Sequence, residues 1–259
     1  MRIVDHSIFG SGAKAIVPEG KDEFYIAYLN SVVALMYLGA LSPTLNYESG
    51  HIASLPVIVS DNDRISNIVK ENIKISKRDW DSFETSWDFQ RHPLLQHAVF
   101  TPQMVAKEEA NGYLTINGIA DAYRHWEQVC NERFNQLKAN EEELNRIFID
   151  IYGLQDELTP EVADKDVTVR KADLGRDIRS FISYAVGCMF GRYSLDVDGL
   201  AYAGGEWDSS KYASFAADKD NIIPICDDEY FEDDIVGLFV EFVKTVYGAD
   251  TPVSYTHLR

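Results

Sequence analysis

Apolar residues recur every three or four positions along several long stretches of this sequence, and this spacing constrains the fold more than any other feature. In an α-helix such residues lie on one face, which other parts of the chain must cover. The spacing predicts helices over residues 22–41, 117–152, 174–193 and 235–247, and a further helix within residues 61–90. Short apolar pieces between turn residues before position 20 favour strands instead. We therefore expect a mainly α fold (α+β), with a few strands near the N-terminus.

The chain is expected to divide into four consecutive segments. Residues 1–60 hold the short extended pieces, and residues 61–155 form a helical spacer with an aromatic-rich stretch docked on a core. Residues 156–252 form an acidic helical domain, whose connector contains Thr159-Pro160-Glu161, a pattern typical of a helix start. The tail 253–259 has no periodicity and is similar to a translated sequencing adapter, so it is excluded from the fold.

The composition indicates a folded domain in a reducing compartment. Of the 259 residues, 46% are hydrophobic and 12% aromatic, which favours a buried core over disorder. No apolar run approaches the roughly 20 residues that span a bilayer, so no membrane contact is expected. Three widely separated cysteines, with no Cys-x-x-Cys pair, exclude a disulfide framework and favour a cytoplasmic location.

Acidic charge is concentrated in the second half of the chain. Residues 1–140 carry 13 Lys and Arg against 17 Asp and Glu, whereas residues 141–259 carry 11 against 25. DNA-binding surfaces attract phosphates through Lys and Arg, so the second half is not expected to grip DNA. Any DNA contact is expected in the first half.

The catalytic motifs of an amino-methyltransferase do not occur in this sequence. Enzymes that methylate the amine of a flipped base need an Asp/Asn/Ser-Pro-Pro-Tyr/Phe segment, whose polar groups hold the amine and whose ring stacks on the base. The chain has eight prolines and no Pro-Pro pair, so no catalytic residue is expected and the chain alone is expected to be inactive. Phe9–Gly12 superficially matches the Gly-rich loop that binds S-adenosylmethionine, but a strand-like stretch follows where the motif requires a helix. A tight turn is the simpler interpretation, and no cofactor site is expected.

Three patterns that resemble metal sites have simpler explanations. Asp196–Gly199 begins like a calcium loop, but the later ligand, Gly and Glu positions of that loop hold other residue types. The acidic run 227–234 precedes a predicted helix, whose dipole favours carboxylates at its N-terminus. His92 and His97 have no Cys or third His nearby in the sequence. We therefore expect no metal site.

Polar residues in the turn-rich loop after the first predicted helix are candidates for contact with DNA. They are Asn46, Tyr47, Ser49 and His51, to which Lys14 is added as a basic residue of the same half. Asn can read adenine, and a Tyr ring can stack on a base. Asn46 and Ser49 are equally good turn formers, so a simple turn is the alternative.

Five stretches between residues 22 and 248 carry a resemblance to a known family. They are Leu29–Ala34 with Ser42–Pro56, Ile75–Phe89 with His92–Leu95, Ala139–Leu154, Tyr184–Asp196 with Gly199–Gly205, and Asn221–Ile225 with Asp227–Asp234. In this order they resemble the C-terminal region of BREX-type (PglX-like) adenine-specific DNA methyltransferases. The first stretch is similar to the closing segment of that family's target-recognition region.

The resemblance implies a parent protein that transfers a methyl group from S-adenosylmethionine to the exocyclic amine of adenine in double-stranded DNA. Such methylation marks host DNA while partner defence proteins restrict phage. The chain departs from the family because it lacks the whole methyl-transfer domain. We therefore expect a non-catalytic C-terminal fragment, with residues 1–60 as the end of the target-recognition region and Met1 as an internal methionine. Its expected role is DNA target recognition and docking of partner proteins.

Three other roles stay open on the sequence alone. An interaction scaffold without direct DNA contact is favoured by the acidic second half and the lack of a basic stripe. A DNA mimic would need a regular ladder of surface acids, which the Lys and Arg residues interrupt. An independent small enzyme is least favoured, because no catalytic constellation stands out.

Overall fold

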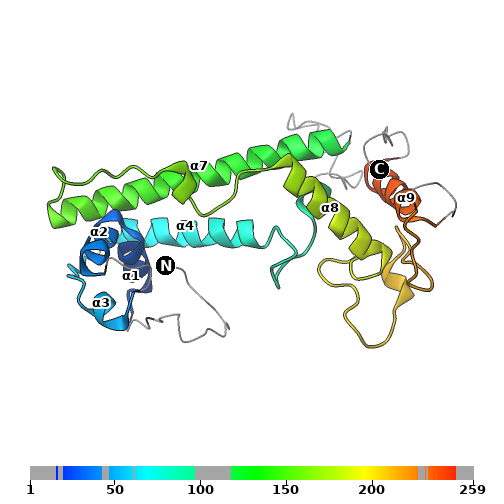
Figure 1. Cartoon of the computed structure of the whole chain (residues 1–259), viewed down its shortest axis with the longest axis horizontal. Helices are drawn as coiled ribbons and strands as arrows, with labels where there is room; N and C mark the ends of the chain where they lie inside the picture. Colours follow the sequence, from blue (N-terminus) through cyan, green and yellow to red (C-terminus); the bar gives the residue numbers. More distant parts are fainter. Residues whose placement is uncertain are drawn as a thin grey trace. The chain divides into compact units, whose positions relative to one another are not determined.

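The structure, a computed structural model, describes residue 16 and residues 20–42, 47–60, 62–96, 118–226, 231 and 233–248. Within these ranges every regular element is a helix, so the prediction of a mainly α fold is confirmed. The strands expected before position 20 lie outside the described residues, as does the tail 253–259. Figure 1 shows the helices in chain order.

The chain forms two compact units, and each unit is built from two separate stretches of sequence. The first unit comprises residues 1–77 and 132–170, and the second comprises residues 78–131 and 171–259. Two long helices, α4 (Asp63–Trp80) and α7 (Ile119–Tyr152), contribute residues to both units. The four consecutive segments expected from the sequence stay a prediction.

The first unit buries an aromatic and aliphatic core among α1 (Asp22–Asn30), α2 (Val32–Leu41), α3 (Ser49–Ala53), α4 and the end of α7. Its centre is Phe148 on α7, whose ring centroid lies 5.7 Å from that of Phe24 and 5.6 Å from that of Tyr28. Figure 1 shows α1, α2 and α3 next to one another in this unit. The core therefore joins the start of the chain to residues more than a hundred positions later.

The single helix expected over residues 22–41 is wrong, because Ser31 divides it into α1 and α2. Ser31 has extended backbone angles, and its hydroxyl donates to the carbonyl of Tyr28 at 2.7 Å and accepts from the amide of Ala34 at 3.3 Å. The side chain of Asn145 on α7 accepts a hydrogen bond from the amide of Val32 at 2.9 Å. Free amides at the start of α2 are thus satisfied by an N-cap and by a tertiary contact.

The helix start expected at Thr159-Pro160-Glu161 is also wrong, since the short helix η1 begins only at Asp164 (Asp164–Asp166). The carbonyl of Pro160 accepts from Asn145 Nδ2 at 3.1 Å, and the amide of Val162 donates to Glu142 Oε1 at 3.2 Å. Side chains of α7 therefore satisfy backbone groups that a helix would otherwise have paired.

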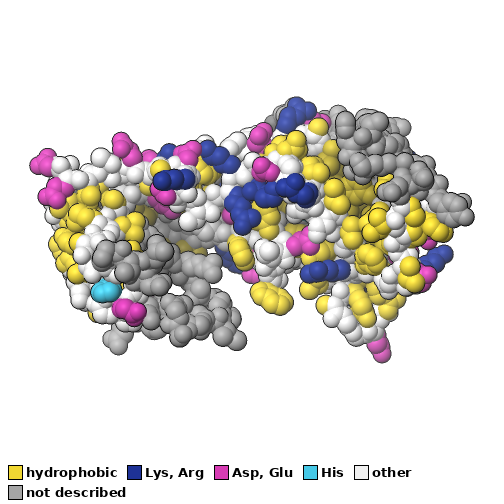
Figure 2. All heavy atoms as spheres, viewed as in Figure 1, with side chains coloured by type: hydrophobic (Ala, Val, Ile, Leu, Met, Phe, Trp, Pro, Cys, Tyr) yellow, Lys and Arg dark blue, Asp and Glu magenta, His cyan; other side chains and the backbone are white. Residues whose placement is uncertain are grey.

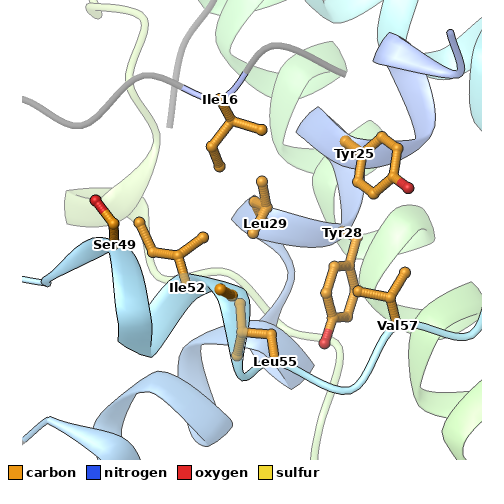
Figure 3. Close-up of a pocket in the computed structure, with 9 residues that line it drawn as sticks. Ile16, Tyr25, Tyr28, Leu29, Ser49, Ile52, Leu55 and Val57 are labelled. Atoms are coloured by element: carbon orange, nitrogen blue, oxygen red, sulfur yellow. The ribbon is translucent and has the colours of Figure 1, made fainter. Parts of the chain in front are cut away.

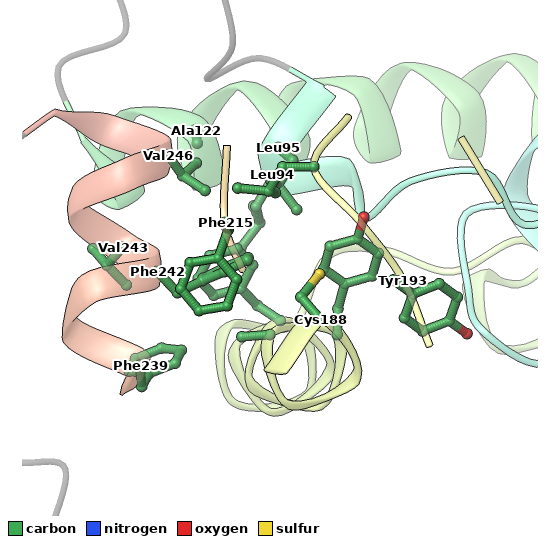
Figure 4. Close-up of a cluster of buried hydrophobic side chains, with 14 of the residues drawn as sticks. Leu94, Leu95, Ala122, Cys188, Tyr193, Phe215, Phe239, Phe242, Val243 and Val246 are labelled. Atoms are coloured by element: carbon green, nitrogen blue, oxygen red, sulfur yellow. The ribbon is translucent and has the colours of Figure 1, made fainter. Parts of the chain in front are cut away.

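The second unit packs α5 (Pro93–Gln96), α8 (Leu174–Met189) and α9 (Ile235–Tyr247) with the first turns of α7. Figure 4 shows Phe242 and Val243 of α9 in the core beside Phe215 and the side chains of α8. The buried carboxylate of Asp177 accepts from Trp126 Nε1 at 3.1 Å and from Arg176 Nε at 2.7 Å. A buried charge is tolerated there because an ion pair and hydrogen bonds compensate it.

The aromatic-rich stretch after α4 is only partly docked on this core. Phe89 is buried against Tyr184 and Tyr193, with centroid distances of 5.9 and 5.6 Å. Trp80 is 48% exposed and Trp87 is 98% exposed. The expected docking therefore holds for Phe89 and is wrong for Trp87.

No single helix among the described residues is long and apolar enough to cross a membrane. Within the same residues one pair, α1 and α2, reaches that length and composition together, but the pair is bent by 65°.

Candidate nucleic-acid interface

The short helix α3 carries the described part of the predicted DNA-contact loop. Its N-terminus is closed by a capping box, in which Glu48 accepts from the amide of His51 and His51 Nδ1 accepts from the amide of Glu48 at 3.2 Å. At its other end, Ser54 Oγ donates to the carbonyl of Gly50 at 2.8 Å. Local hydrogen bonds thus define the conformation of this short helix.

Two tyrosines hold the residues that follow α3. The hydroxyls of Tyr28 and Tyr152 both donate to the carbonyl of Pro56, each at 2.6 Å, and the amide of Ile58 donates to Tyr152 Oη at 3.0 Å. The two rings stack at 8° with their centroids 5.7 Å apart. Desolvation by burial, followed by the hydrogen bond with Tyr152, raises the pKa of Tyr28, so this phenol stays a neutral donor. No local sequence pattern indicates this anchor, because its parts come from three distant stretches.

An apolar cavity of about 350 Å³ lies between α3 and α1. Its lining is mostly aliphatic and aromatic, and consists of Ile16, Tyr25, Tyr28, Leu29, Ser49, Ile52, Ala53, Leu55 and Val57. Figure 3 shows Ile52 and Leu55 directed toward Leu29, with Ser49 at the edge. The cavity has few polar groups that could orient a nucleotide.

The predicted contact residues have different environments. Ser49 is exposed on the first turn of α3, and His51 is half-buried. Because His51 Nδ1 accepts a hydrogen bond, the proton of the neutral ring is on Nε2, which is therefore a donor. Tyr47 is half-buried against the first-unit core, which leaves less of its ring for stacking on a base. Asn46 and Lys14 lie outside the described residues.

Several basic side chains of the first unit form ion pairs within the protein. Arg64 pairs with Glu143 at 2.6 Å, Lys70 with Glu23 at 3.5 Å and Lys138 with Asp164 at 2.7 Å. On the face drawn in Figure 2, Lys and Arg occur in separate groups interspersed with Asp and Glu. Contact with DNA through this unit would therefore rely on polar side chains more than on net charge.

At the positions that resemble a metal or cofactor site, the described side chains form hydrogen bonds, ion pairs or core contacts within the protein. Asp196 accepts hydrogen bonds from the amide and hydroxyl of Ser214, and Asp198 pairs with Arg91 at 3.1 Å. His92 is buried beside Phe181, and burial lowers its pKa to about 3. No group of three His, Cys, Asp or Glu that could hold a metal ion occurs in the described ranges. Phe9–Gly12, His97 and most of the run 227–234 fall outside them.

Comparison with known proteins gives two curated relatives that match most of this chain. The chain is 47% identical over 229 residues to the adenine-specific methyltransferase PglX of Lacticaseibacillus casei (strain Zhang), which covers 88% of the chain and 18% of that protein. It is 32% identical over 275 residues to the adenine-specific methyltransferase BrxX of Escherichia coli O9:H4 (strain HS), which covers 94% of the chain and 21% of that protein. The chain thus spans about a fifth of the length of these relatives. No family model matches it.

The fold and the comparisons together define the class: the chain is helical in its described part and is similar to about a fifth of the length of adenine-specific methyltransferases. The chain belongs to the BREX PglX-like adenine-specific methyltransferases, and it corresponds to one part of such a protein. The family resemblance of the five sequence stretches is therefore confirmed.

Proposed function

We propose that this chain is a non-catalytic part of an adenine-specific DNA methyltransferase that acts in phage defence. The parent protein would methylate the exocyclic amine of adenine in double-stranded DNA, with S-adenosylmethionine as the methyl donor. Within it, the first unit contributes to target recognition through α3, and the rest of the chain docks partner proteins. The identity of 47% to a methyltransferase over 88% of the chain is the observation that carries this proposal.

The absence of a Pro-Pro segment from the sequence supports a non-catalytic role. The base-binding segment and the cofactor loop would then belong to other parts of the parent. Cys130, Cys188 and Cys226 form no disulfide with one another, which is consistent with the proposed cytoplasmic location.

The α3 segment suits DNA recognition because it presents polar groups from a fixed backbone. Ser49 offers a hydroxyl and His51 offers the Nε2 donor, and either can bond a phosphate or a base edge. The hydrogen bonds of Tyr28 and Tyr152 to Pro56 would hold this segment in place during binding. Asn46, Tyr47 and Lys14 remain proposed contacts of the same surface.

The proposal is tested in the full-length parent protein. Asn46→Ala with Tyr47→Ala, and separately Ser49→Ala with His51→Gln, should weaken sequence-selective DNA binding by roughly tenfold, as expected for the loss of one or two polar contacts. S-adenosylmethionine binding, measured by calorimetry, should not change. Unchanged selectivity in both pairs would mean that α3 is not part of the recognition surface.

Gly50 provides a steric test of the same surface. A Cβ added at Gly50 would meet no atom within 4 Å, so Gly50→Ala should leave the fold intact. If DNA approaches α3 closely, Gly50→Leu should reduce selective binding more than Gly50→Ala does. Gly39→Leu is the matched control, because a Cβ at Gly39 would also meet no atom within 4 Å and Gly39 lies on a different helix, α2.

A protein-interaction scaffold without direct DNA contact is the second candidate function. The charge of residues 141–259, with 11 Lys and Arg against 25 Asp and Glu, favours it. A scaffold would bind another defence protein in the absence of DNA, and the α3 variants would leave that binding unchanged. Selectivity loss in those variants would favour DNA recognition instead.

A further inference from the structure

Trp87 is exposed to a degree that is unusual for tryptophan. Its side chain is 98% exposed, whereas Trp126 in the same unit is 3% exposed. Tryptophan is highly buried on average, and leaving a large apolar ring in water forgoes substantial hydrophobic stabilisation. The second unit therefore presents an indole that its own core does not use.

The turn that carries Trp87 is held by hydrogen bonds on both sides of it. Ser86 Oγ donates to Asp81 Oδ1 at 2.7 Å and accepts from the amide of Asp88 at 3.1 Å. The amide of Ser86 donates to the carbonyl of Phe83 at 3.0 Å. Phe89, two positions after Trp87, is anchored in the core. Since the backbone around the indole is already ordered, docking it costs little conformational entropy.

The charge of the turn indicates what kind of surface it fits. Residues 81–90 contain Asp81, Glu84 and Asp88 and no Lys or Arg. Three carboxylates on the same short stretch would repel DNA phosphates, which disfavours stacking of the indole on a base. They would attract a protein surface whose apolar pocket is bordered by Lys or Arg. Tryptophan is among the residues that most often dominate such interfaces.

We propose that Trp87 anchors the second unit to the part of the parent polypeptide that lies outside this chain, by inserting into an apolar pocket with a basic border. The inference rests on the proposed function, in which this chain is one part of a longer methyltransferase. About four fifths of the length of the relatives lies outside the matched region. A segment joined through the same chain is present at a high effective concentration, so it is the first candidate to cover an exposed anchor.

Hydroxyl-radical footprinting with mass spectrometry tests this proposal residue by residue. In the isolated 259-residue chain, Trp87 should be oxidised fast and Trp126 slowly, in line with their exposed fractions of 98% and 3%. In the full-length parent, without DNA, oxidation of Trp87 should fall toward the rate of Trp126. Equal oxidation of Trp87 in the two proteins would overturn the proposal, and so would protection that appears only when DNA or another protein is added.

Variants separate docking from folding. In the isolated chain Trp87→Ala should leave the melting temperature unchanged, because the indole has almost no buried area to lose. In the parent, Trp87→Ala should raise the undocked population about thirtyfold, which is the effect of losing a tryptophan hot spot. The increase would be measured as faster hydrogen exchange in residues 81–90. Thr85→Lys should raise the same exchange about fivefold by repelling the basic border, whereas the matched variant Thr85→Glu should not.

These outcomes are independent of the proposed DNA recognition. The oxidation rate of Trp87 can be measured in a parent that methylates DNA normally. If the α3 variants bind DNA with unaltered selectivity, the oxidation of Trp87 still tests the docking proposal. If Thr85→Lys and Thr85→Glu had the same effect on hydrogen exchange in residues 81–90 of the parent, the proposed basic border of the pocket would be wrong.

Discussion

Gly187 of α8 lies directly against a buried aromatic ring. A Cβ at this position would be 2.6 Å from Cδ2 and 3.0 Å from Cε2 of Tyr193. Tyr193 is 2% exposed and stacks on Tyr184 with centroids 4.9 Å apart, so its ring has little room to move. Overpacking of this kind costs about 1–3 kcal/mol, more than the roughly 1 kcal/mol that alanine gains over glycine in a helix.

We therefore predict that Gly187→Ala lowers the free energy of unfolding by up to about 2 kcal/mol in urea denaturation. Gly39→Ala on α2 is the control, because a Cβ there meets no atom within 4 Å. It should raise the free energy of unfolding by up to about 1 kcal/mol. A stabilising Gly187→Ala would contradict the close contact with Tyr193.

His92 makes the stability of the second unit depend on pH. Its side chain is 3% exposed, Nδ1 accepts from the amide of Leu94 at 3.3 Å, and burial lowers the pKa from 6.5 to about 3. The unfolded chain takes up a proton below pH 6.5 while the folded protein does not. The contribution of neutral His92 to the free energy of unfolding is therefore complete above pH 6.5 and is lost as the pH falls toward 3.

At pH 5 this group alone should cost about 2 kcal/mol relative to pH 7. The measurement is urea denaturation of the wild type and His92→Gln at pH 7, 6 and 5, since the difference between the two isolates the histidine. The carboxyl of Glu141 acts in the opposite sense, because burial raises its pKa to about 7 and the folded state gains its proton first. A pH dependence that is the same in both proteins would refute the assignment to His92.

Among the elements, the boundary between α1 and α2 depends on a residue of α7. Asn145 is 7% exposed, accepts from the amide of Val32 at 2.9 Å and donates to the carbonyl of Pro160 at 3.1 Å. Asn145→Leu would leave both backbone groups without this partner, and each unsatisfied buried group costs about 1–3 kcal/mol. Because both hydrogen bonds are only partly buried, we predict a total loss in the lower part of the summed range, about 2–4 kcal/mol in the free energy of unfolding.

Gln155→Leu is a suitable control for Asn145→Leu in the same denaturation experiment. The Gln155 amide bonds Asp150 Oδ1 at 3.0 Å in an exposed position, so its loss should change stability by less than about 0.5 kcal/mol. Equal effects of the two substitutions would mean that the amide of Asn145 does not stabilise the boundary.

The same boundary shows which elements the sequence can predict. Helices α7, α8 and α9 have sustained apolar spacing. Helices α8 and α9 also have capping side chains, Asp173 and Asp234, which accept from the amides of Arg176 and Gly237, each at 2.6 Å. The break at Ser31 and the extended path around Pro160 both depend on α7 side chains that arrive only after folding. For the candidate site, residue type pointed to Ser49 and His51, but nothing in the local pattern pointed to Tyr28 and Tyr152. Local spacing cannot report contacts between distant stretches.

At the scale of the whole molecule, neither unit is one continuous piece of sequence. In the second unit, Phe181 of α8 packs against Phe242 of α9, with centroids 5.7 Å apart. The same core needs Phe89, Leu94 and Trp126 from residues 78–131. A fragment that begins at residue 171 lacks these side chains and would expose the apolar surface that they cover. It would therefore lose much of its hydrophobic stabilisation.

We therefore predict that the core of the second unit folds cooperatively in residues 78–259, which contain all of that unit, and that it does not in residues 171–259. Near-UV circular dichroism and thermal unfolding of the two fragments provide the measurement, since fixed aromatic packing gives a near-UV signal and a sharp transition. The shorter fragment should retain helical far-UV signal while its near-UV signal is lost. The same experiment on residues 156–252 tests whether the acidic segment expected from the sequence is a domain of its own. A sharp transition in residues 171–259 would show that α8 and α9 form a core without Phe89, Leu94 and Trp126.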